Sequence, residues 1–462
     1  MDYTNNNNNN MHKNTHKKTL AAMSALVGAM VAGGFAAQAQ TGSTNANVSK
    51  LEQENQELRK RVDNLEQFLE KEGLKPSGSA AKADPPVSAL TDVAISGFVS
   101  TSYFFDVDNS KDSHPTGYLW NTSLNSFIVN KIKLTLASPA VDKEKWDAAY
   151  RASFIWGSDA PIVDTGSLKD PGFSWLREAY IELNAPIGTG LNFKAGELIS
   201  LLNYESGDGG AANGNFSQGY QWYYTGNPPA AAVQVAYDFN DMVGIKLRLQ
   251  NGLYTGPVDS GSKTFVGGLY INPDKKTSIA LLGFDGRQDF NPAWTITGGS
   301  VIASRQLMEA HNLTFATEFD YFHFSGFDPG AAILTPGTSD SGPVFLKNGA
   351  TSGNFWSIGG WLSADLITKL GATLRGEYLV DATGFGTFWN SPAPGADAGF
   401  PSSIYTTGAG QALTEVTFTL DYKPTPTLKI QPEIRWNHSS YAGALNGKRD
   451  QVIVGMGASY LF

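Results

Sequence analysis

The sequence predicts an all-β fold, a transmembrane antiparallel β-barrel of about sixteen strands preceded by a short α-helical coiled coil. Three observations predict it. Stretches of about ten residues after residue 92 alternate apolar and polar side chains, the period of a strand with two unlike faces. The connections between these stretches alternate between short and long. Leucines at heptad spacing precede them, at 48–72.

The N-terminus predicts a secretory signal peptide at 1–39, with Met11 as an alternative start. Lysines precede an apolar stretch at 20–37, and AQA at 37–39 offers small residues for cleavage. An uncleaved membrane anchor is the alternative. The stretch is mostly alanine and glycine and only just long enough to span a bilayer, which disfavours that alternative.

Composition narrows the remaining classes of protein. The chain has 462 residues, no cysteine and a formal net charge of −9. Without cysteine, neither a disulfide framework nor a thiolate metal site can form. Removal of the signal peptide leaves a net charge of −11, which disfavours nucleic acid as a partner. No segment after residue 40 has the ~20 consecutive apolar residues that a spanning helix needs.

The segment 48–72 predicts a parallel coiled coil. In one heptad frame the core positions a and d are filled throughout, and we expect oligomerisation through Leu51, Asn55, Leu58, Val62, Leu65 and Leu69. Arg61 would face Glu66 of a parallel neighbour, and the two would attract. An isolated helix of this length is marginal, so association must supply its stability.

Residues 61–66, RVDNLE, resemble the short trimerisation motif of coiled coils, in which an arginine packs over the core and bonds a neighbouring glutamate. The resemblance implies a homotrimer. Asn55 at a core position is also compatible with a dimer, so both states remain open. A spacer at 40–47 and a Pro/Gly/Ser/Ala linker at 73–91 flank the coil.

KWDAAYRASFIW at 145–156 illustrates the strand pattern of the domain at 92–462. Trp146 and Tyr150 share one face with other apolar residues, and Arg151 lies on the opposite face. This suits a strand between lipid and water. A soluble β-sandwich also alternates, but its strands are usually five or six residues long. Aromatic residues near strand ends predict interfacial girdles: Tyr103, Phe104, Phe105, Trp146, Trp156, Tyr321 and Phe322.

The connections give the strand number. We assign the short turns to the periplasmic end, near 138–145, 184–190, 239–242, 272–276, 304–310, 367–370 and 423–426. Long loops are expected near 106–126, 157–173, 201–229, 251–262, 285–292, 325–353, 381–411 and 438–448. Together these imply about sixteen strands, and a barrel of that size encloses an aqueous channel.

The C-terminal strand carries a family resemblance. In QVIVGMGASYLF, alternate residues are apolar up to Tyr460 and the terminal Phe462, which resembles the last strand of bacterial outer-membrane porins. In that family this strand is the recognition signal for the barrel-assembly machinery. The segments 95–106, 176–198 and 203–222 are similar to the porin family with OmpL-like members. Phosphate-selective trimeric porins are the second family considered, but no dominant basic ladder is present.

Inward-facing charges are the candidate pore lining, because charged rings set selectivity. Taken by parity, they are Lys131, Lys133, Arg151, Glu178, Glu182, Lys194, Lys246, Arg248, Glu318, Asp320, Arg375, Glu377, Glu415, Lys429, Glu433 and Arg435. Opposing basic and acidic walls would create a transverse field. The alternative is that these pairs only hold neighbouring strands together.

The loop at 201–229 is the candidate constriction, with Tyr204, Glu205, Asp208, Tyr220, Trp222, Tyr223 and Tyr224. Folded inward, its aromatic rings could stack on sugars. The sequence favours the other interpretation for 220–224, a place in the outer aromatic girdle. A calcium site in DVDNSKD is not expected, because Lys111 replaces the glycine of a calcium loop.

The resemblance implies an outer-membrane porin that forms a water-filled channel for passive diffusion of small hydrophilic solutes or ions, with its coiled coil in the periplasm. We expect no cofactor and no metal, and partners limited to outer-membrane lipid, further copies of the chain and the assembly machinery. An envelope tether and a hydrolase remain as alternatives. Outside the signal peptide only four histidines could serve a hydrolase, and no catalytic motif is present: His114, His311, His323 and His438.

Overall fold

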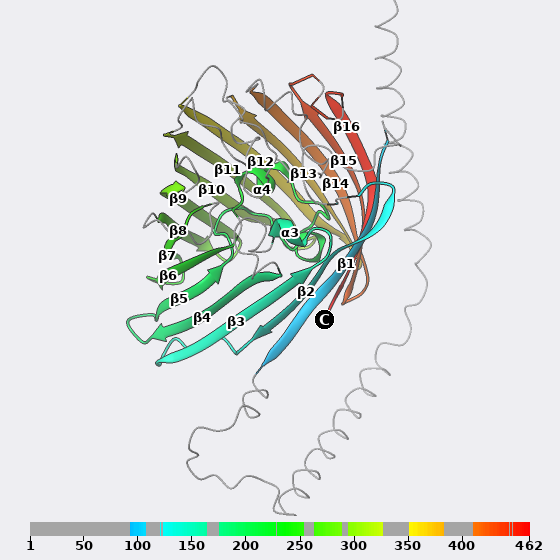
Figure 1. Cartoon of the computed structure of the whole chain (residues 1–462). Coiled ribbons are helices and arrows are strands. Elements are labelled where there is room, and N and C mark those ends of the chain that lie inside the picture. Colours follow the sequence, from blue (N-terminus) through cyan, green and yellow to red (C-terminus); the bar gives the residue numbers. More distant parts are fainter. Residues whose placement is uncertain are drawn as a thin grey trace, which may run out of the picture. The chain divides into compact units, whose positions relative to one another are not determined.

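The alternating stretches form one closed β-barrel in the computed structural model (Figure 1). The described residues all belong to one unit, Pro85–Phe462. The expected signal peptide, spacer, coiled coil and linker lie outside the described residues. The structure describes residues 93–107, 121, 123–163, 175–227, 229–253, 263–288, 294–326, 351–382, 410–442, 444–445 and 447–462.

Each strand pairs antiparallel with its neighbours in sequence. The strands are β1 Ala94–Asp106, β2 Ser126–Ala137, β3 Asp147–Trp156, β4 Leu176–Ala185, β5 Leu191–Leu198, β6 Ala230–Asp238, β7 Val243–Gln250, β8 Thr264–Asp274, β9 Thr277–Gln288, β10 Trp294–Met308, β11 Leu313–Ser325, β12 Ser352–Ile367, β13 Leu370–Asp381, β14 Gln411–Thr425, β15 Leu428–Ser439 and β16 Asp450–Leu461. The expected sixteen-strand barrel is therefore confirmed.

The first and last strands close the barrel. Gly97 N donates to Phe462 O at 2.9 Å, and Phe462 N donates to Gly97 O at 3.0 Å. Phe98 lies opposite Leu461 in the register. Closure leaves no unpaired sheet edge, which a membrane-spanning sheet requires because lipid offers no hydrogen-bond partners.

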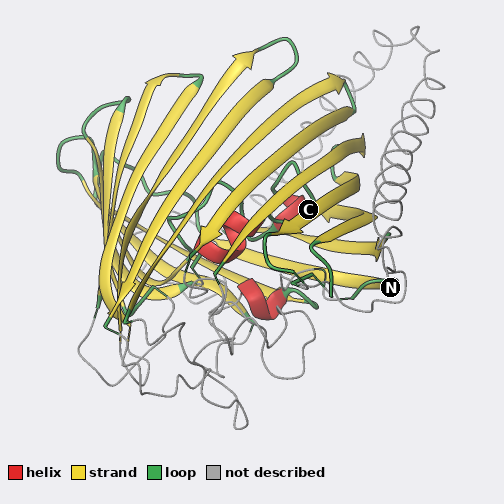
Figure 2. Ribbon diagram, turned by 90° about the horizontal axis from the view of Figure 1, so that it is seen from above, coloured by secondary structure: helices red, strands yellow, loops and turns green. Residues whose placement is uncertain are grey.

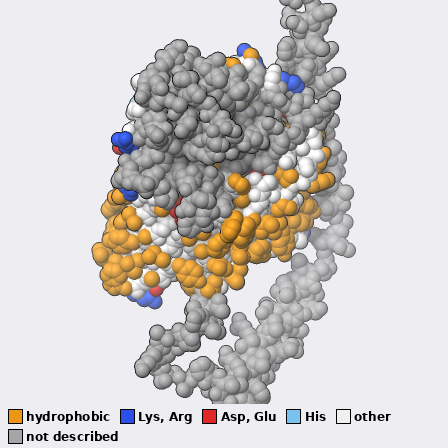
Figure 3. All heavy atoms as spheres, in the orientation of Figure 1, with side chains coloured by type: hydrophobic (Ala, Val, Ile, Leu, Met, Phe, Trp, Pro, Cys, Tyr) orange, Lys and Arg blue, Asp and Glu red, His pale blue; other side chains and the backbone are white. Residues whose placement is uncertain are grey.

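Alternation gives the barrel an apolar outside and a polar inside. In β13, Leu374 and Tyr378 point outward and are 45 % and 42 % exposed, whereas Arg375 and Glu377 point inward and are buried. The same pattern on neighbouring strands produces the hydrophobic band on the outer surface in Figure 3. Such a band is the surface that a hydrocarbon layer solvates.

The observed connections lie close to the expected ones, but several begin later. Residues 272–274 belong to β8 and residues 285–288 to β9, so the connections expected at 272–276 and 285–292 begin at 275 and 289. Residues 304–308 belong to β10, so the turn expected at 304–310 lies at 309–312 instead. Residues 423–425 extend β14, and the turn follows at 426–427. Both strands continue beyond the last lipid-facing pair because backbone pairing persists into the hairpin.

Two of the expected girdle aromatics face the wrong way for that role. Phe104 and Phe322 are 2 % and 0 % exposed and point into the barrel. The girdle prediction is wrong for them, because each has the parity of a buried inward carboxylate on its own strand, Asp106 and Asp320. Tyr321, by contrast, is 42 % exposed on the outside.

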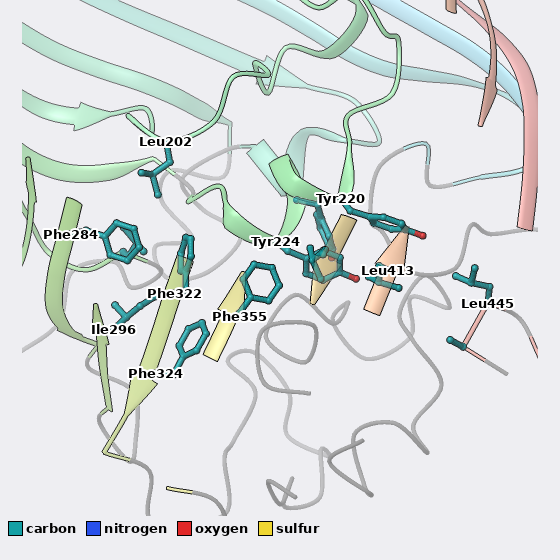
Figure 4. Packing of buried hydrophobic residues seen from close by; sticks show 14 of the residues in the cluster. Leu202, Tyr220, Tyr224, Phe284, Ile296, Phe322, Phe324, Phe355, Leu413 and Leu445 are labelled. Atoms are coloured by element: carbon teal, nitrogen blue, oxygen red, sulfur yellow. The ribbon is translucent and has the colours of Figure 1, made fainter. Parts of the chain in front are cut away.

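An apolar cluster lies in the barrel interior, on the inner face of the strands. Phe284, Phe322 and Phe355 point toward one another (Figure 4). The ring centroids of Phe284 and Phe322 are 4.7 Å apart, and those of Phe322 and Phe355 are 5.9 Å apart. Their strands β9, β11 and β12 belong to one side of the barrel. Part of the interior is therefore a packed core, with Leu202 and Tyr224 from the connection between β5 and β6 in the same cluster.

The helices within the described part of the chain are short. They are α3 Ala160–Val163, the 3-10 turn η4 Gly209–Ala211 and α4 Tyr220–Thr225. None of them has the length and apolar character to cross a membrane. Both α3 and α4 lie within the ring of strands in Figure 2.

Candidate functional site

The candidate site is the connection between β5 and β6, described at 199–227 and 229 and called the inner loop below. It carries η4 and α4, and η4 contacts β1, β15 and β16 while α4 contacts β12 and β13. These strands lie across the barrel from β5 and β6 in the closed order. The inner loop therefore crosses the lumen and packs on the opposite wall.

Arg375 on β13 is the strongest anchor of the inner loop. Its Nη1 lies 2.7 Å from Glu205 Oε1 of the loop, and its Nε lies 3.0 Å from Glu415 Oε2 on β14. Nη1 also donates to the Ser217 carbonyl at 2.6 Å. All three charged side chains are at most 2 % exposed. One guanidinium thus holds a loop carboxylate and a wall carboxylate together away from bulk solvent.

Glu433 and Arg435 on β15 form a second anchor. Glu433 accepts hydrogen bonds from the backbone N–H groups of Phe216 and Ser217, at 2.7 Å and 3.2 Å. Arg435 donates to the carbonyl of Gln218 at 2.6 Å, and its guanidinium lies 4.8 Å from the centre of the Tyr220 ring. Backbone groups of the inner loop are thereby satisfied by the wall rather than by water.

Acidic side chains of β11 form a third anchor. Gln221 donates to Asp320 Oδ2 at 2.6 Å, and the backbone N–H of Tyr204 donates to Glu318 Oε2 at 2.7 Å. Asn203 also donates to Glu318, at 3.1 Å. Carboxylates that accept several N–H bonds are the stronger kind of acceptor, so they hold both ends of the loop.

On the other side, Asp208 ties the inner loop to β2. Lys133 Nζ lies 2.7 Å from Asp208 Oδ2. Burial alone would raise the pKa of the Asp208 carboxyl, but the neighbouring charges of Lys133, Arg177 and Lys131 outweigh it and hold the pKa below its ordinary value. Burial likewise raises the pKa of the Tyr220 hydroxyl, against the opposing effect of Arg435.

Glycine allows the loop and the wall to approach closely. A Cβ at Gly219 would lie 1.9 Å from Glu377 Oε1, and a Cβ at Gly457 of β16 would lie 2.1 Å from the Phe216 ring. Neither distance is sterically allowed without a shift. The run of small residues at 206–215 therefore suits a segment that presses its backbone against another surface.

The girdle interpretation of 220–224 is wrong. Tyr220, Tyr223 and Tyr224 are 0 %, 6 % and 3 % exposed inside the barrel. Tyr204 keeps 39 % exposure and packs against Trp361 with ring centroids 4.9 Å apart. Of the constriction candidates, Glu205 and Asp208 are fastened to the wall, and Trp222 lines a cavity of about 220 Å³ beside the loop.

All candidate pore-lining charges lie at inward positions, but the inner loop divides them into two groups. The residues on β11–β15 that face the loop are essentially sealed: Glu318, Asp320, Arg375, Glu377, Glu415, Glu433 and Arg435 are 0–4 % exposed. On β3–β5 the side chains of Arg151, Glu182 and Lys194 keep 36 %, 18 % and 25 % exposure. Part of the β3–β8 wall is therefore more open than the wall beneath the loop, although Glu178 and Arg248 on β4 and β7 are only 5 % and 4 % exposed.

The signs of charge also differ between the two walls. Lys131, Lys133, Arg151, Lys194, Lys246 and Arg248 lie on β2–β7, and Glu318, Asp320, Glu377, Glu415 and Glu433 lie on β11–β15. The exceptions are Glu178 and Glu182 on β4, Arg375 on β13, and Lys429 and Arg435 on β15. Lys429 Nζ donates to the carbonyl of Gly210 at 2.7 Å. Sequence parity could assign the faces but not this loop contact.

Several residues that sequence reasoning did not single out complete the docking of the loop. Gln218 and Gln221 are loop amides with 1 % and 0 % exposure, and Asn215 donates to Thr419 of β14 at 2.7 Å. The one signal for them was polar amides among glycines in NGNFSQGYQW, at 213–222.

The described histidines do not form a catalytic arrangement. His311 contacts the Asp365 carbonyl, His323 contacts Asn354, and His438 lies 2.9 Å from Asp450. His114 lies outside the described residues. Within the described part no group of three potential metal ligands occurs.

Comparisons with known proteins agree with this architecture. The family model described as “Putative beta-barrel porin-2, OmpL-like” matches residues 92–462. No curated protein matches the chain.

Three solved structures resemble it in fold. The high-pH structure of Pseudomonas putida OprB has a TM-score of 0.51 and 11 % identity, over 81 % of this chain and 96 % of that chain. The anion-selective porin from Comamonas acidovorans has a TM-score of 0.48 and 9 % identity, over 80 % and 99 %. The channel DcaP of Acinetobacter baumannii has a TM-score of 0.47 and 14 % identity, over 80 % and 97 %.

Proposed function

This chain belongs to the family of OmpL-like beta-barrel porins, and we propose that solutes cross its barrel along the β3–β8 wall, past the inner loop as constriction. The chain is an outer-membrane channel for solute diffusion. Its family and fold are those of a channel rather than an enzyme.

The observation that supports this route is that the inner loop buries inward residues of β14 and β15 more completely than some inward residues of β6 and β8. On β14 and β15, Thr419 and Gln431 point inward and are 0 % exposed beneath the inner loop. On β6 and β8, Ala236 and Tyr270 point inward and are only half-buried. A hydrated solute needs accessible polar surface, so the half-lumen beside β3–β8 is the path that the loop leaves.

Cysteine accessibility tests the route, because the natural chain has no cysteine to interfere. Ala236→Cys places a thiol on the proposed path, and Ser357→Cys places one at an inward position of β12 that is 0 % exposed. In a planar bilayer, a charged thiol-specific reagent should lower the conductance of Ala236→Cys and leave Ser357→Cys and the natural chain unchanged. The opposite pattern would refute the route, and absence of conductance from the natural chain would refute the channel.

We further propose that the coiled coil at 48–72 joins three chains on the periplasmic side. The support is the RVDNLE motif, in which Arg61 would pair with Glu66 of a neighbour. We also propose that the last strand, with Tyr460 and Phe462, is read by the barrel-assembly machinery. Both rings are more than half exposed on the finished barrel, which is compatible with earlier recognition.

A further inference from the structure

A cavity of about 220 Å³, called the side cavity below, lies where the two ends of the inner loop meet. Its lining comes from residues within 199–207 and 222–227, together with Arg177 of β4. Because the loop begins directly after β5, the side cavity adjoins the β3–β8 wall and the proposed solute path. At the ~30 Å³ that a molecule of liquid water occupies, its volume equals about seven waters. That is room for one small organic ring and not for a chain of rings.

The charged groups that line the side cavity are already committed to partners. Glu205 Oε1 lies 2.7 Å from Arg375 Nη1. Arg177 is 8 % exposed, its Nη1 donates to the Val163 carbonyl at 2.8 Å, and the opposite charge of Asp208 lies close to its own. An ion that entered the side cavity would therefore lose water without gaining a counter-charge, which is costly. A neutral ligand has no such penalty.

Asn203 offers the side cavity a hydrogen-bond acceptor. Its Nδ2 donates to Glu318 Oε1 at 3.1 Å and to Thr225 Oγ1 at 2.8 Å. Because a carboxylate can only accept, these bonds fix which amide atom is nitrogen. The other amide atom, Oδ1, is buried and has no hydrogen-bond partner in the described part of the chain. A buried acceptor of this kind calls for an O–H or N–H donor from a molecule in the cavity.

The backbone around Asn203 keeps its Oδ1 accessible. A Cβ at position 226, which also lines the side cavity, would lie 2.6 Å from Oδ1, so Gly226 leaves the space beside the acceptor open. Asn203 itself has φ +77°, in the left-handed region that few residues other than glycine adopt. Such conformations persist where the surroundings hold them and cluster at ligand sites.

Aromatic and aliphatic side chains supply the rest of the lining. Tyr204 is 39 % exposed, and Trp361 supports its ring at a centroid distance of 4.9 Å. Trp222, Leu202 and Ile199 complete this apolar surface. Apolar and aromatic walls with a few fixed polar atoms are the usual lining of sites for small organic molecules.

We propose that the side cavity is a subsite for small neutral polyhydroxylated solutes, of the size and kind of a monosaccharide. A hydroxyl of the solute donates to Asn203 Oδ1, and the C–H face of its ring lies against Tyr204. Such a solute combines the donor that the acceptor requires with a carbon ring that the apolar lining accommodates. Binding must be weak enough for release, as conduction requires. This proposal rests on the proposed route along the β3–β8 wall.

Block of the ion current by D-glucose tests the subsite. In a planar bilayer with potassium chloride, glucose should lower the current of the natural chain and the effect should saturate with concentration. Triglyme, a neutral polyether of similar mass without O–H or N–H donors, should lower the current in proportion to its concentration. Saturation with both solutes would overturn the recognition of hydroxyls. A proportional effect of both on a conducting chain would overturn the subsite while leaving the channel and its route intact.

Two variants place the effect in the side cavity. Gly226→Ala covers Asn203 Oδ1, and Tyr204→Leu removes the exposed ring. Each should raise the half-blocking glucose concentration about five-fold, the effect of one lost hydrogen bond or aromatic contact. Tyr180→Leu is the matched control, because Tyr180 is a half-buried inward residue of β4 outside the cavity lining.

The response to triglyme should stay natural in all three variants, and heat-modifiable migration on gels identifies folded barrels. Equal glucose block in Tyr204→Leu and Tyr180→Leu would overturn the placement of the subsite.

Discussion

Replacing Arg375 should release the inner loop while leaving the barrel intact. Arg375→Met leaves Glu205, 2 % exposed, buried without its cation, and leaves Glu415, 0 % exposed, with only Arg435 Nε at 3.9 Å. Removing one partner of a buried ion pair costs about 3–5 kcal/mol, mostly through the stranded charge. Every ~1.4 kcal/mol is a factor of ten in an equilibrium. The ratio of docked to undocked loop should therefore fall by about two orders of magnitude or more.

Single-channel recording measures the result. Because undocking opens the covered half of the lumen, Arg375→Met should show larger and fluctuating conductance levels than the natural chain. The strand ladders of β13 do not depend on the side chain, since residue 375 pairs through its backbone with Trp361 and Thr417. Heat-modifiable migration should accordingly remain that of a folded barrel.

A charge-matched variant separates stranded charge from lost packing. Combining Arg375→Met with Glu205→Gln and Glu415→Gln removes all three charges, and the glutamine oxygen at 205 can still accept the Gly219 N–H that Glu205 accepts at 2.7 Å. This variant should return toward quiet, natural conductance. If Arg375→Met itself conducts like the natural chain, the anchoring role assigned to Arg375 is refuted.

Three other perturbations test separate parts of the molecule. Gly457→Ala forces a Cβ against the Phe216 ring, and the overpacking should cost about 1–3 kcal/mol. The inner loop should loosen and the noise of the channel current should increase. Gly376→Ala is the control, because no heavy atom lies closer than 4.0 Å to its added Cβ, and it should leave the current unchanged. The pKa of the Asp208 carboxyl lies below its ordinary value because Lys133, Arg177 and Lys131 outweigh its burial, so the stabilising ion pair should be present at neutral pH and lost as pH falls through the folded value. Protease sensitivity of the loop should rise only in acid, and Asp208→Asn should abolish that step. Deleting 48–71 should leave conductance per barrel unchanged but reduce cross-linked trimer in detergent, and a cross-linked dimer in the natural chain would contradict the trimer.

The strands and their faces could be predicted because alternation is a local property. Arg248 follows Lys246 by two residues, so a single parity places both on one face of a strand. The same rule would have placed Phe322 correctly, since it shares parity with Asp320. The girdle prediction failed there because adjacent aromatics, Tyr321 and Phe322, occupy opposite faces of β11.

The position of the inner loop could not be predicted because its partners are distant in sequence. Phe216 N bonds Glu433 across 217 residues of chain, and Arg375 reaches Glu205 across 170. An aromatic run such as 220–224 is equally compatible with a membrane interface and with a packed interior. What decides between them is a complementary surface, here the carboxylates, arginines and apolar side chains of β11–β15.

Docking of the inner loop determines which charged side chains of the barrel wall remain exposed in the lumen. The loop buries the acidic wall, where Glu318, Glu377 and Glu433 are at most 4 % exposed, so those charges face the loop and not the solvent. On the opposite wall Lys246 stays partly exposed, whereas Arg248 is 4 % exposed and is as enclosed as the acidic residues. Selectivity depends on the charges that a solute meets, so the side chains that the loop leaves exposed matter more than the net charge of the chain.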